Sequence, residues 1–401
     1  MIDIVIGLRN LGRNRRRTLL TGSLVAFGVI CLIVFQSLKV GMHQQMIVST
    51  TSLDNGILQI HAPDYRPNRS LLQPIKDSAA LLDRLDQHHL LYAERLKTAA
   101  LLLAGPQSSM ISISGIHPDH EARVTQIAAH MSAGEYLGRP DTIVLSQTLC
   151  NALSLSLNDQ VTVMVQDSAG QPALAKLSVI GLYTTGLPSF DTTHAYVELA
   201  TLQQLVKAPQ VISEISLHTS LDRQDETERS LRSLLERNQQ ITPWQETLPD
   251  LVQLIELNDT TMSILIVIVF ILVGMGILNT MTMITYERFE EFGLLAALGY
   301  PPAGVMRMVL AEALFLGTGA ACLGGVIGWI ICLWLGQHGL DLSQFTSNNQ
   351  YFTNAHILYP QVRWADMVAA FSLAAVTCMV SGFFPAWKAA RLNPVEALRH
   401  I

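Results

Sequence analysis

The sequence predicts an α-helical membrane protein in which four transmembrane helices carry one large α/β extracytoplasmic domain. Three observations predict this fold: four long apolar runs, their very uneven spacing, and the polar, globular-looking stretch that separates the first run from the other three. A helix needs about 20 apolar residues to cross the ~30 Å hydrocarbon core of a bilayer, and each run reaches that length. One helix before a translocated domain and three after it is an arrangement that few membrane machines share.

Composition agrees with this class. Hydrophobic residues make up 49% of the chain and charged residues 14%, below the ~25% typical of soluble domains. Acidic residues outnumber basic ones within residues 42–257, so a nucleic-acid partner is excluded. Cys150 is the single cysteine of that stretch, which therefore has no internal disulfide to form. The other cysteines lie in apolar runs, and a metal site built on cysteine is excluded.

The basic residues predict the orientation. A cluster of arginines precedes the first apolar run: Arg9, Arg13, Arg15, Arg16 and Arg17. The positive-inside rule places this cluster in the cytoplasm. Residues 1–18 alternate apolar and basic side chains at roughly helical spacing, so we expect a cytoplasmic amphipathic helix along the inner leaflet. The first run is longer than the apolar region of a signal peptide and no cleavage site follows it, which predicts a signal anchor.

Both termini are therefore expected in the cytoplasm, and the chain in the inner membrane. The expected segments are a first transmembrane helix at 19–41, an extracytoplasmic domain with its stalk at 42–257, a second helix at 258–286, a cytoplasmic coupling loop at 287–304, a third helix at 305–336, an extracytoplasmic loop at 337–363, a fourth helix at 364–387 and a cytoplasmic tail at 388–401. Basic residues at the expected inner ends support this order: Arg288, Lys388, Arg391 and Arg399.

The extracytoplasmic stretch is expected to mix strands and helices. Short β-branched-rich segments predict strands at 56–62, 101–104, 110–116, 142–145, 161–165, 177–183 and 212–218. Apolar residues three and four positions apart predict helices at 75–88, 119–130, 146–153, 199–206 and 222–238. This order predicts a split βαβ sheet interrupted by an inserted lobe near residues 135–200. A stalk that continues the second transmembrane helix outward is expected to begin just before Pro249.

Motifs for catalysis are missing from the sequence. It has no G-x-x-x-x-G-K-[ST] phosphate loop, no H-E-x-x-H zinc motif and no G-x-S-x-G elbow. His117 and His120 stand three residues apart beside acidic residues, but they follow the pattern of a solvated helix start after Pro118 better than that of a metal site. We therefore expect no catalytic, cofactor-binding or metal residues and no enzymatic activity in this chain.

Polar residues inside apolar runs are costly and often functional. Glu312 is open to two interpretations. The first is an ion or proton site. The second is a side chain near the inner interface, five residues after Arg307, that forms an ion pair or reaches the headgroups. The second interpretation is preferred. Gly324 and Gly328 form a small-xxx-small face that permits close approach of another helix.

The most specific patterns are two cytoplasmic segments. ERFEEFGLLAALG, at residues 287–299, predicts a short amphipathic helix with its charges first and its apolar residues last, ended by Gly299 and Pro301. PAWKAARLNPVEALR, at residues 385–399, leaves the fourth helix as a short basic tail.

Together with RNLGRNRRRT at 9–18, these segments closely resemble the FtsX-like permeases of the MacB and LolC/LolE type, the mechanotransmission class of ABC transporters. VIGLYTTGLPSFDTT at 179–193 resembles the LolC/LolE lipoprotein-releasing branch in particular. The resemblance implies a porter-like domain with a smaller inserted subdomain. It also implies a homodimer or a heterodimer with a second permease, bound to two copies of a cytoplasmic ATPase subunit. ATP and Mg would bind that partner, and no cofactor would bind this chain.

The same resemblance assigns candidate site residues. The implied ATPase-coupling residues are Glu287, Arg288, Glu290, Glu291, Phe292, Gly293, Leu294, Leu298, Gly299, Arg391, Pro394, Glu396 and Arg399. A lipidated cargo would enter from the outer leaflet, because acyl chains prefer lipid to water by ~0.8 kcal/mol per CH₂. The residues best placed to line a cargo vestibule near that leaflet are Phe35, Leu38, Ile264 and Ile268.

The substrate stays open between several functions. Extraction of lipoproteins or lipids from the outer leaflet is favoured, with MacB-like efflux of peptides, toxins or drugs through a periplasmic adaptor as the alternative. An FtsX-like regulator of cell-wall hydrolases and a membrane receptor or sensor are the remaining candidates. One departure bears on the choice: residues 166–176 form a short turn where LolC has a long hooked hairpin that recruits a periplasmic chaperone.

Overall fold

The computed structural model describes residues 15–63, 65, 73–341 and 357–392, which divide into two compact units. We call residues 15–44, 254–341 and 357–392 the helical unit, and Gln45–Gln253 the sheet unit. Most of the expected N-terminal amphipathic helix, much of the loop at 337–363 and the tail residues Pro394, Glu396 and Arg399 lie outside the described residues.

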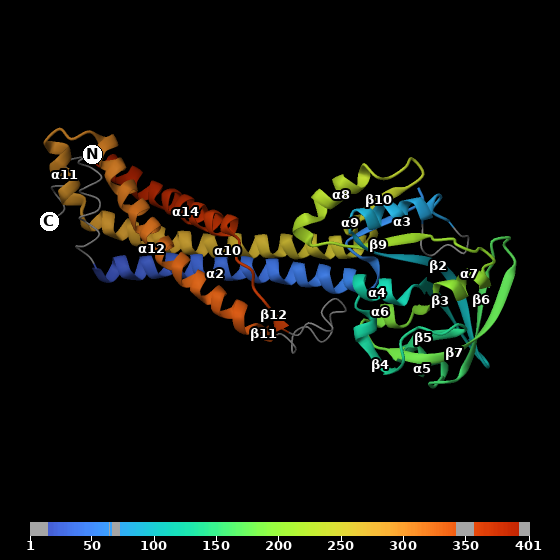
Figure 1. The fold of residues 1–401 in the computed structure, drawn as a ribbon. Helices are drawn as coiled ribbons and strands as arrows, with labels where there is room; N and C mark the ends of the chain where they lie inside the picture. The colour runs from blue at the N-terminus through green and yellow to red at the C-terminus, as the bar shows by residue number, and fades with distance from the viewer. Residues whose placement is uncertain (1–14, 64, 66–72, 342–356, 393–401) are drawn as a thin grey trace. The chain divides into compact units, whose positions relative to one another are not determined.

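Four helices are long and apolar enough to cross a membrane. They are α2 (Arg15–Thr50), α10 (Pro249–Glu287), α12 (Pro302–His338) and α14 (Trp364–Ala390). The short helix α11 (Phe289–Ala297) lies between α10 and α12, and β11 (Leu340–Asp341) pairs with β12 (Ile357–Leu358) (Figure 1). The helix α10 starts at Pro249, where the stalk was predicted to start.

Small residues bring the long helices together. A Cβ built on Gly324 of α12 would lie 2.5 Å from the carbonyl oxygen of Ala26 in α2. Likewise, a Cβ on Gly28 would lie 2.8 Å from Val273 in α10, and one on Gly317 would meet Cys378 in α14 at 2.3 Å. The predicted small-residue face of α12 therefore packs against α2 of the same chain, where it lets the two backbones approach.

The sheet unit contains a mixed sheet with short helices packed against it. Its strands are β1 (Leu58–His61), β2 (Leu91–Ala104), β3 (Gln107–Ile116), β4 (Met131–Gly134), β5 (Thr142–Ser146), β6 (Gln160–Gln166), β7 (Pro172–Tyr183), β8 (His194–Glu198), β9 (Glu214–His218) and β10 (Gln240–Pro243). Its helices are η1 (Thr51–Asn55, a π-helix), α3 (Ser78–Gln87), α4 (Pro118–Val124), η2 (Ile127–His130), α5 (Gln147–Leu153), α6 (Pro188–Asp191), α7 (Leu199–Leu205), η3 (Leu221–Arg223), α8 (Gln224–Arg232) and α9 (Trp244–Thr247).

The strand order closes one part of the sheet into a small barrel. From β2 the pairing runs through β3, β8, β5, β7 and β6 and returns to β2. The barrel surrounds buried side chains such as Leu102, Ile113 and Val163. The N-terminal half of β2 instead pairs with β9, which continues through β1 to the edge strand β10. The long strand β2 thus belongs to both parts of the sheet (Figure 1).

The lobe expected near residues 135–200 contributes β5, β6, β7 and β8 to this barrel. These strands form no separate sheet, because β2 and β3 complete their hydrogen bonding. The predicted strands all overlap observed ones. The prediction missed β4, β8, β10 and the first part of β2.

Candidate functional site

The helix α11 and the residues directly before and after it carry most of the predicted coupling residues. Glu290 and Glu291 stand in its first turn, where negative charge stabilises the helix dipole. The helix ends at Ala297, and Gly299, just after the C-cap Leu298, has a φ of 84°, the left-handed conformation that favours glycine. Two capping bonds close the end, from the amide of Gly299 to the carbonyl of Ala296 at 3.0 Å and from Tyr300 to Leu295 at 3.0 Å. The local sequence therefore accounts for both ends of α11.

Arg288 anchors α11 to the next membrane helix. Its Nη1 donates to Oε2 of Glu312 in α12 at 2.8 Å, and its Nε donates to Oε2 of Glu291 at 3.0 Å. The guanidinium also lies over the ring of Phe292, 5.0 Å from the ring centroid. Both Arg288 and Glu312 are buried, so each charge depends on the other for compensation. Pairing was the preferred prediction for Glu312, but the partner is Arg288, and Arg307 instead donates to the carbonyl of Ala303.

The structure separates the predicted coupling residues on α11 into two sets. Phe292 and Gly293 are buried against the helical unit. Glu290, Leu294 and Leu298 are exposed, and their spacing of four residues aligns them along one side of the helix. Leu294 is 55% exposed and Leu298 is 77% exposed. We call Glu290, Leu294 and Leu298 the exposed stripe.

The end of α14 lies beside α11. A cavity of about 310 Å³ between them is lined by Phe292, Ala296, Gly299, Tyr300, Pro301, Pro302, Val305, Ala389, Ala390 and Leu392. Arg391 lies over the ring of Trp387, 4.5 Å from its centroid, and Lys388 hydrogen-bonds to Tyr286. Glu287 accepts a hydrogen bond from Arg17 of α2. The motif at 287–299 and the described part of the second motif, residues 385–392, are far apart in sequence but meet at one end of the helical unit (Figure 1).

The predicted vestibule residues lie on two neighbouring helices. Ile264 and Ile268 of α10 are 58% and 53% exposed, whereas Phe35 and Leu38 of α2 are half-buried. All four are apolar and none is buried in the core of the helical unit. Their surface suits contact with lipid or with another apolar chain.

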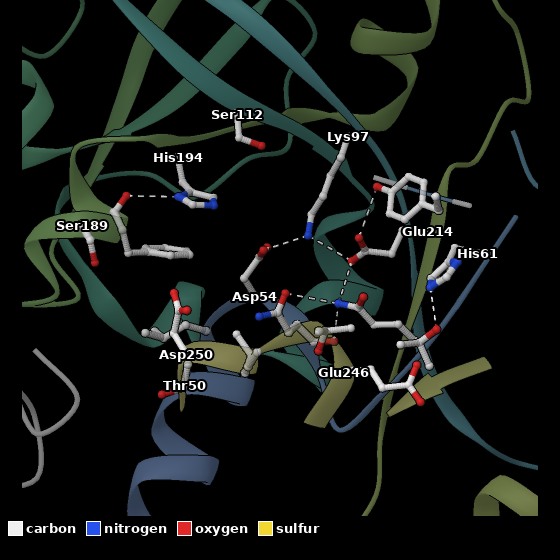
Figure 2. Close-up of a pocket in the computed structure, with 18 of the residues that line it drawn as sticks. Thr50, Asp54, His61, Lys97, Ser112, Ser189, His194, Glu214, Glu246 and Asp250 are labelled. Atoms are coloured by element: carbon white, nitrogen blue, oxygen red, sulfur yellow. Dashed lines mark hydrogen bonds and ion pairs between the residues drawn. The ribbon is translucent and has the colours of Figure 1, made fainter. Parts of the chain in front are cut away.

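A second polar centre, which the sequence analysis did not find, lies in the sheet unit. Arg95 of β2 is fully buried and donates from Nη2 to Oε1 of Glu121 at 2.7 Å and from Nε to Oε2 of Glu121 at 2.9 Å. Its Nη1 donates to Oε1 of Glu214 at 3.0 Å. The Nζ of Lys97 donates to Oδ2 of Asp54 at 2.8 Å and to the same Glu214 oxygen at 3.0 Å (Figure 2). We call these five residues the charge cluster.

In the charge cluster, burial and the attraction between opposite charges shift the pKa values in opposite directions. Burial alone would raise the pKa of Asp54, but Lys97 and Arg95 outweigh it and hold the pKa well below its ordinary value. Burial likewise would lower the pKa of Lys97, but Asp54 and Glu214 outweigh it and raise the pKa. Both groups are therefore charged at neutral pH. The signal that could have revealed the cluster is a run of charges, Glu94, Arg95 and Lys97, inside a stretch that is otherwise apolar.

His117 and His120 lie at the start of α4. Within the described part of the chain, no group of three or more His, Cys, Asp or Glu side chains could hold a metal ion. His117 stacks on His120 with ring centroids 4.6 Å apart, and His120 contacts Glu94 at 2.9 Å. The pair opens α4, as the sequence predicted.

Two protein families match the chain. Residues 18–234 match the MacB-like periplasmic core domain, and residues 263–394 match the FtsX-like permease C-terminal family. The chain is 24% identical over 422 residues to a lipoprotein-releasing system transmembrane protein LolC of Xylella fastidiosa (strain Temecula1), covering 100% of this chain and 99% of that protein. It is 22% identical to LolC of Neisseria meningitidis serogroup B, again over 100% of this chain and 99% of that one.

A further relative is longer than this chain. The macrolide export ATP-binding/permease protein MacB of Sodalis glossinidius is 22% identical over 98% of this chain but only 60% of its own length. Among solved structures, the periplasmic region of MacB from Actinobacillus actinomycetemcomitans matches 52% of this chain and 98% of that one, with 14% identity and a TM-score of 0.37.

Proposed function

The chain belongs to the FtsX-like permease family with a MacB-like periplasmic core domain, and we propose that it transmits the motion of a cytoplasmic ATPase to its extracytoplasmic sheet unit. It is an ABC transporter permease of the LolC and MacB family, a multi-pass inner-membrane protein with a large extracytoplasmic domain. In our proposal both termini and α11 face the cytoplasm. ATP and Mg bind a separate ATPase subunit, two copies of which serve a dimer of permeases.

One observation carries this proposal: α11 presents an exposed stripe while Arg288 fixes its opposite side to α12. A helix that transmits force from a partner needs two properties. It needs an exposed surface that the partner can bind, and it needs a rigid attachment to the helix that is to move. The stripe offers one charge, Glu290, and two large apolar side chains, Leu294 and Leu298. The fully buried core of a protein interface is more apolar than its rim, so Leu294 and Leu298 suit such a core and Glu290 suits its rim.

The proposed roles of the coupling residues divide accordingly. Glu290, Leu294, Leu298 and Gly299 contact the ATPase. Arg288, Glu291, Phe292 and Gly293 hold α11 in place, and Glu287 ties the end of α10 to α2 through Arg17. Arg391 forms a second contact with the ATPase, and the resemblance assigns Pro394, Glu396 and Arg399 to the same role.

For the cargo we propose extraction of lipoproteins or lipids from the outer leaflet. The segment at 179–193, which resembles the LolC/LolE branch, and the match to a LolC-named relative over 99% of that protein's length support it. In this proposal the acyl chains of the cargo enter against Phe35, Leu38, Ile264 and Ile268. Efflux of a soluble substrate through a periplasmic adaptor, as the name of the MacB relative implies for that protein, is the second candidate. A periplasmic chaperone would belong to the first function and an adaptor to the second.

Photo-crosslinkers at the four vestibule positions distinguish the two cargo functions. Adducts with a lipoprotein that change when ATP is added support extraction. If no cargo adduct forms at any of the four positions, efflux of a soluble substrate becomes the better assignment.

The coupling function is tested with the tagged full chain, purified from membranes of its own host with the ATPase that accompanies it. We expect Glu290→Lys and the double variant Leu294→Ser/Leu298→Ser to insert normally but to lose the ATPase. The matched controls are Met110→Ser and Leu174→Ser, whose side chains in the sheet unit are 67% and 62% exposed. Both controls should retain the ATPase. Wild-type recovery and stimulation of the ATPase by the stripe variants would refute the assignment.

A further inference from the structure

The helix α2 enters the sheet unit through an unusual segment. Its last turn passes into the π-helix η1, of which Thr51, Ser52, Leu53 and Asp54 are buried. Single-turn π-helices are rare and occur frequently at functional sites. The segment begins directly after Thr50, the last residue of a helix that runs unbroken from Arg15. Any displacement of α2 along its axis is therefore delivered first to η1.

Hydrogen bonds fasten the backbone of η1 to the sheet unit. The carbonyl of Ser52 accepts from the amide of Gln126 at 2.7 Å. The carbonyl of Asn55 accepts from Nε2 of Gln59 at 2.8 Å and from the hydroxyl of Ser216 at 3.0 Å. The carbonyl of Asp54 accepts from Arg95. These donors lie on β1, β2, β9 and in the segment after α4, so η1 is tied to several elements at once.

The side chain of Asp54 extends this attachment into the charge cluster. Its Oδ2 accepts from Lys97, and its Oδ1 lies 3.6 Å from Nη1 of Arg95. Both cations belong to β2 and both also bind Glu214 of β9. Figure 2 shows Lys97 reaching between Asp54 and Glu214. Charge pairs attract strongly in a buried environment, so this link resists separation more than contacts between neutral groups do.

The second long helix joins the sheet unit differently. The helix α10 begins at Pro249, just after α9, whose Trp244 hydrogen-bonds to Gln224 at 3.1 Å and to the carbonyl of Ile57 at 3.0 Å. Glu246 and Asp250 stand at this junction, and neither forms an ion pair with another described residue. The start of α10 is thus held by neutral contacts, whereas the end of α2 is held by charges.

A cavity of about 840 Å³ lies against the cluster. Its lining includes Asp54, Lys97 and Glu214 together with Glu246 and Asp250 (Figure 2). Among the described residues, this space leaves part of the surroundings of Asp54 open. The charge link therefore adds to the backbone hydrogen bonds as a contact through which a displacement of η1 reaches β2 and β9.

We propose that Asp54 is a positioning residue, a charged joint that makes β2 and β9 follow the movement of α2. This inference rests on the proposed coupling function and assigns the route by which motion enters the sheet unit. In this scheme α2 drives the sheet unit, and α10 adjusts at its neutral junction.

The charge cluster has one more carboxylate than it has cations, so Asp54 can be neutralised without unfolding the sheet unit. The cluster holds the carboxylates of Asp54, Glu121 and Glu214 against the cations of Arg95 and Lys97. Asp54→Asn therefore leaves Arg95 and Lys97 balanced by Glu121 and Glu214, with no change of side-chain size. Asp54→Ala goes further and removes the contact, and its truncated side chain opens onto the existing cavity. The matched control is Asp167→Asn, which affects a buried carboxylate paired with Lys207 at 2.9 Å on the β6–β7 hairpin.

The experiment is hydrogen exchange of the full chain in complex with its ATPase in nanodiscs, without nucleotide and with Mg, ATP and vanadate. In the wild type and in Asp167→Asn, we expect nucleotide to change exchange in α11 and in η1, β2 and β9. In Asp54→Ala the change in α11 should persist while the change in β2 and β9 becomes clearly smaller, and Asp54→Asn should fall between. At a temperature well below the thermal midpoint of Asp54→Asn, the nucleotide-free exchange of the sheet unit in this variant should match the wild type, which excludes a merely structural effect.

The possible failures are distinguishable. If β2 and β9 still respond fully to nucleotide in both Asp54 variants, the joint is overturned while the coupling function stands. If nucleotide leaves α11 unchanged even in the wild type, the proposed coupling function fails, and the joint fails with it.

Discussion

The chain buries a guanidinium in each of its two units, and it compensates the two charges in different ways. Arg95, in the sheet unit, has no exposed surface and meets both oxygens of Glu121, one oxygen of Glu214 and the backbone of Asp54. Arg288, in the helical unit, has one buried carboxylate partner, Glu312, and a second, Glu291, that is partly solvated.

The difference lies in how many partners share each charge. The charge on Arg95 is shared among several residues on three elements, so its loss would leave several buried carboxylates without compensation. The pair of Arg288 and Glu312 joins only two helices, so both partners can be removed together. A network fixes the arrangement of a whole domain, whereas a single pair fixes one helix to its neighbour. The network around Arg95 therefore stabilises a folded domain, whereas the pair of Arg288 and Glu312 acts as a tether between two helices. Mutations at the two arginines test this difference.

The largest effect is expected from Arg95→Met. This change leaves Asp54, Glu121 and Glu214 with Lys97 as their only cation among the cluster residues, and removing one partner of a buried charge pair costs about 3–5 kcal/mol. We expect the sheet unit to unfold while the membrane helices stay inserted. Limited proteolysis of the full chain, with fragments mapped by mass spectrometry, measures this. A resistant sheet unit in Arg95→Met would show that Arg95 is not the centre of that core.

A smaller effect is expected from Arg288→Met, about 2 kcal/mol from the unpaired Glu312. The double variant Arg288→Met/Glu312→Met should recover most of that stability, because no buried charge then lacks a partner. It should nevertheless stimulate the ATPase poorly, because α11 is no longer tethered to α12. Unfolding in mixed detergent and ATPase stimulation together give the measurement. Full stimulation by the double variant would mean that the pair only compensates charge.

The same comparison explains what the sequence could predict. The apolar runs, the start of α10 and the ends of α11 were predictable because each depends on local pattern: run length, a proline, or a glycine at the helix end. The first part of β2 was missed because Glu94, Arg95 and Lys97 argue locally against a buried strand. Their partners, Asp54, Glu121 and Glu214, are distant in sequence, so no window of the chain reveals that these charges are paired.

The candidate site shows the same limit. The exposed stripe follows from helical spacing and was within reach of the sequence. The partner of Glu312 was not, because sequence proximity pointed to Arg307 whereas the tertiary structure supplies Arg288 from 24 residues away. The edge strands β4 and β10 and the short strand β8 were missed for a related reason. Each is four or five residues long and depends on pairing with a neighbour for its conformation.

The charge cluster also makes the stability of the sheet unit depend on pH in a defined way. The pKa of Asp54 is depressed in the folded state, so its stabilisation is present above the ordinary aspartate value of about 3.9 and is lost as the pH falls through the folded pKa. The pKa of Lys97 is raised, so its stabilisation is complete below about 10.4 and is lost as the pH rises through the folded pKa. Burial lowers the pKa of His194, which interacts with Asp54, so this histidine titrates below about pH 7.5. Between roughly pH 7.5 and 9, the difference in thermal midpoint between wild type and Asp54→Asn should therefore stay constant. A difference that varies across this range would mean that one partner titrates there.

The smallest effect is expected at a third arginine, Arg307, which provides the control for Arg288. Arg307 lies on the first turns of α12, but it is exposed and donates only to the carbonyl of Ala303 at 3.2 Å among the described contacts. Exposed substitutions without a buried partner usually change stability by less than about 0.5 kcal/mol. Arg307→Met should therefore unfold in mixed detergent as the wild type does, even though it removes the same charge and adds the same side chain as Arg288→Met. If the two variants lost equal stability, the cost would come from removing positive charge at this end of the helical unit, and the tether between α11 and α12 would have no special role.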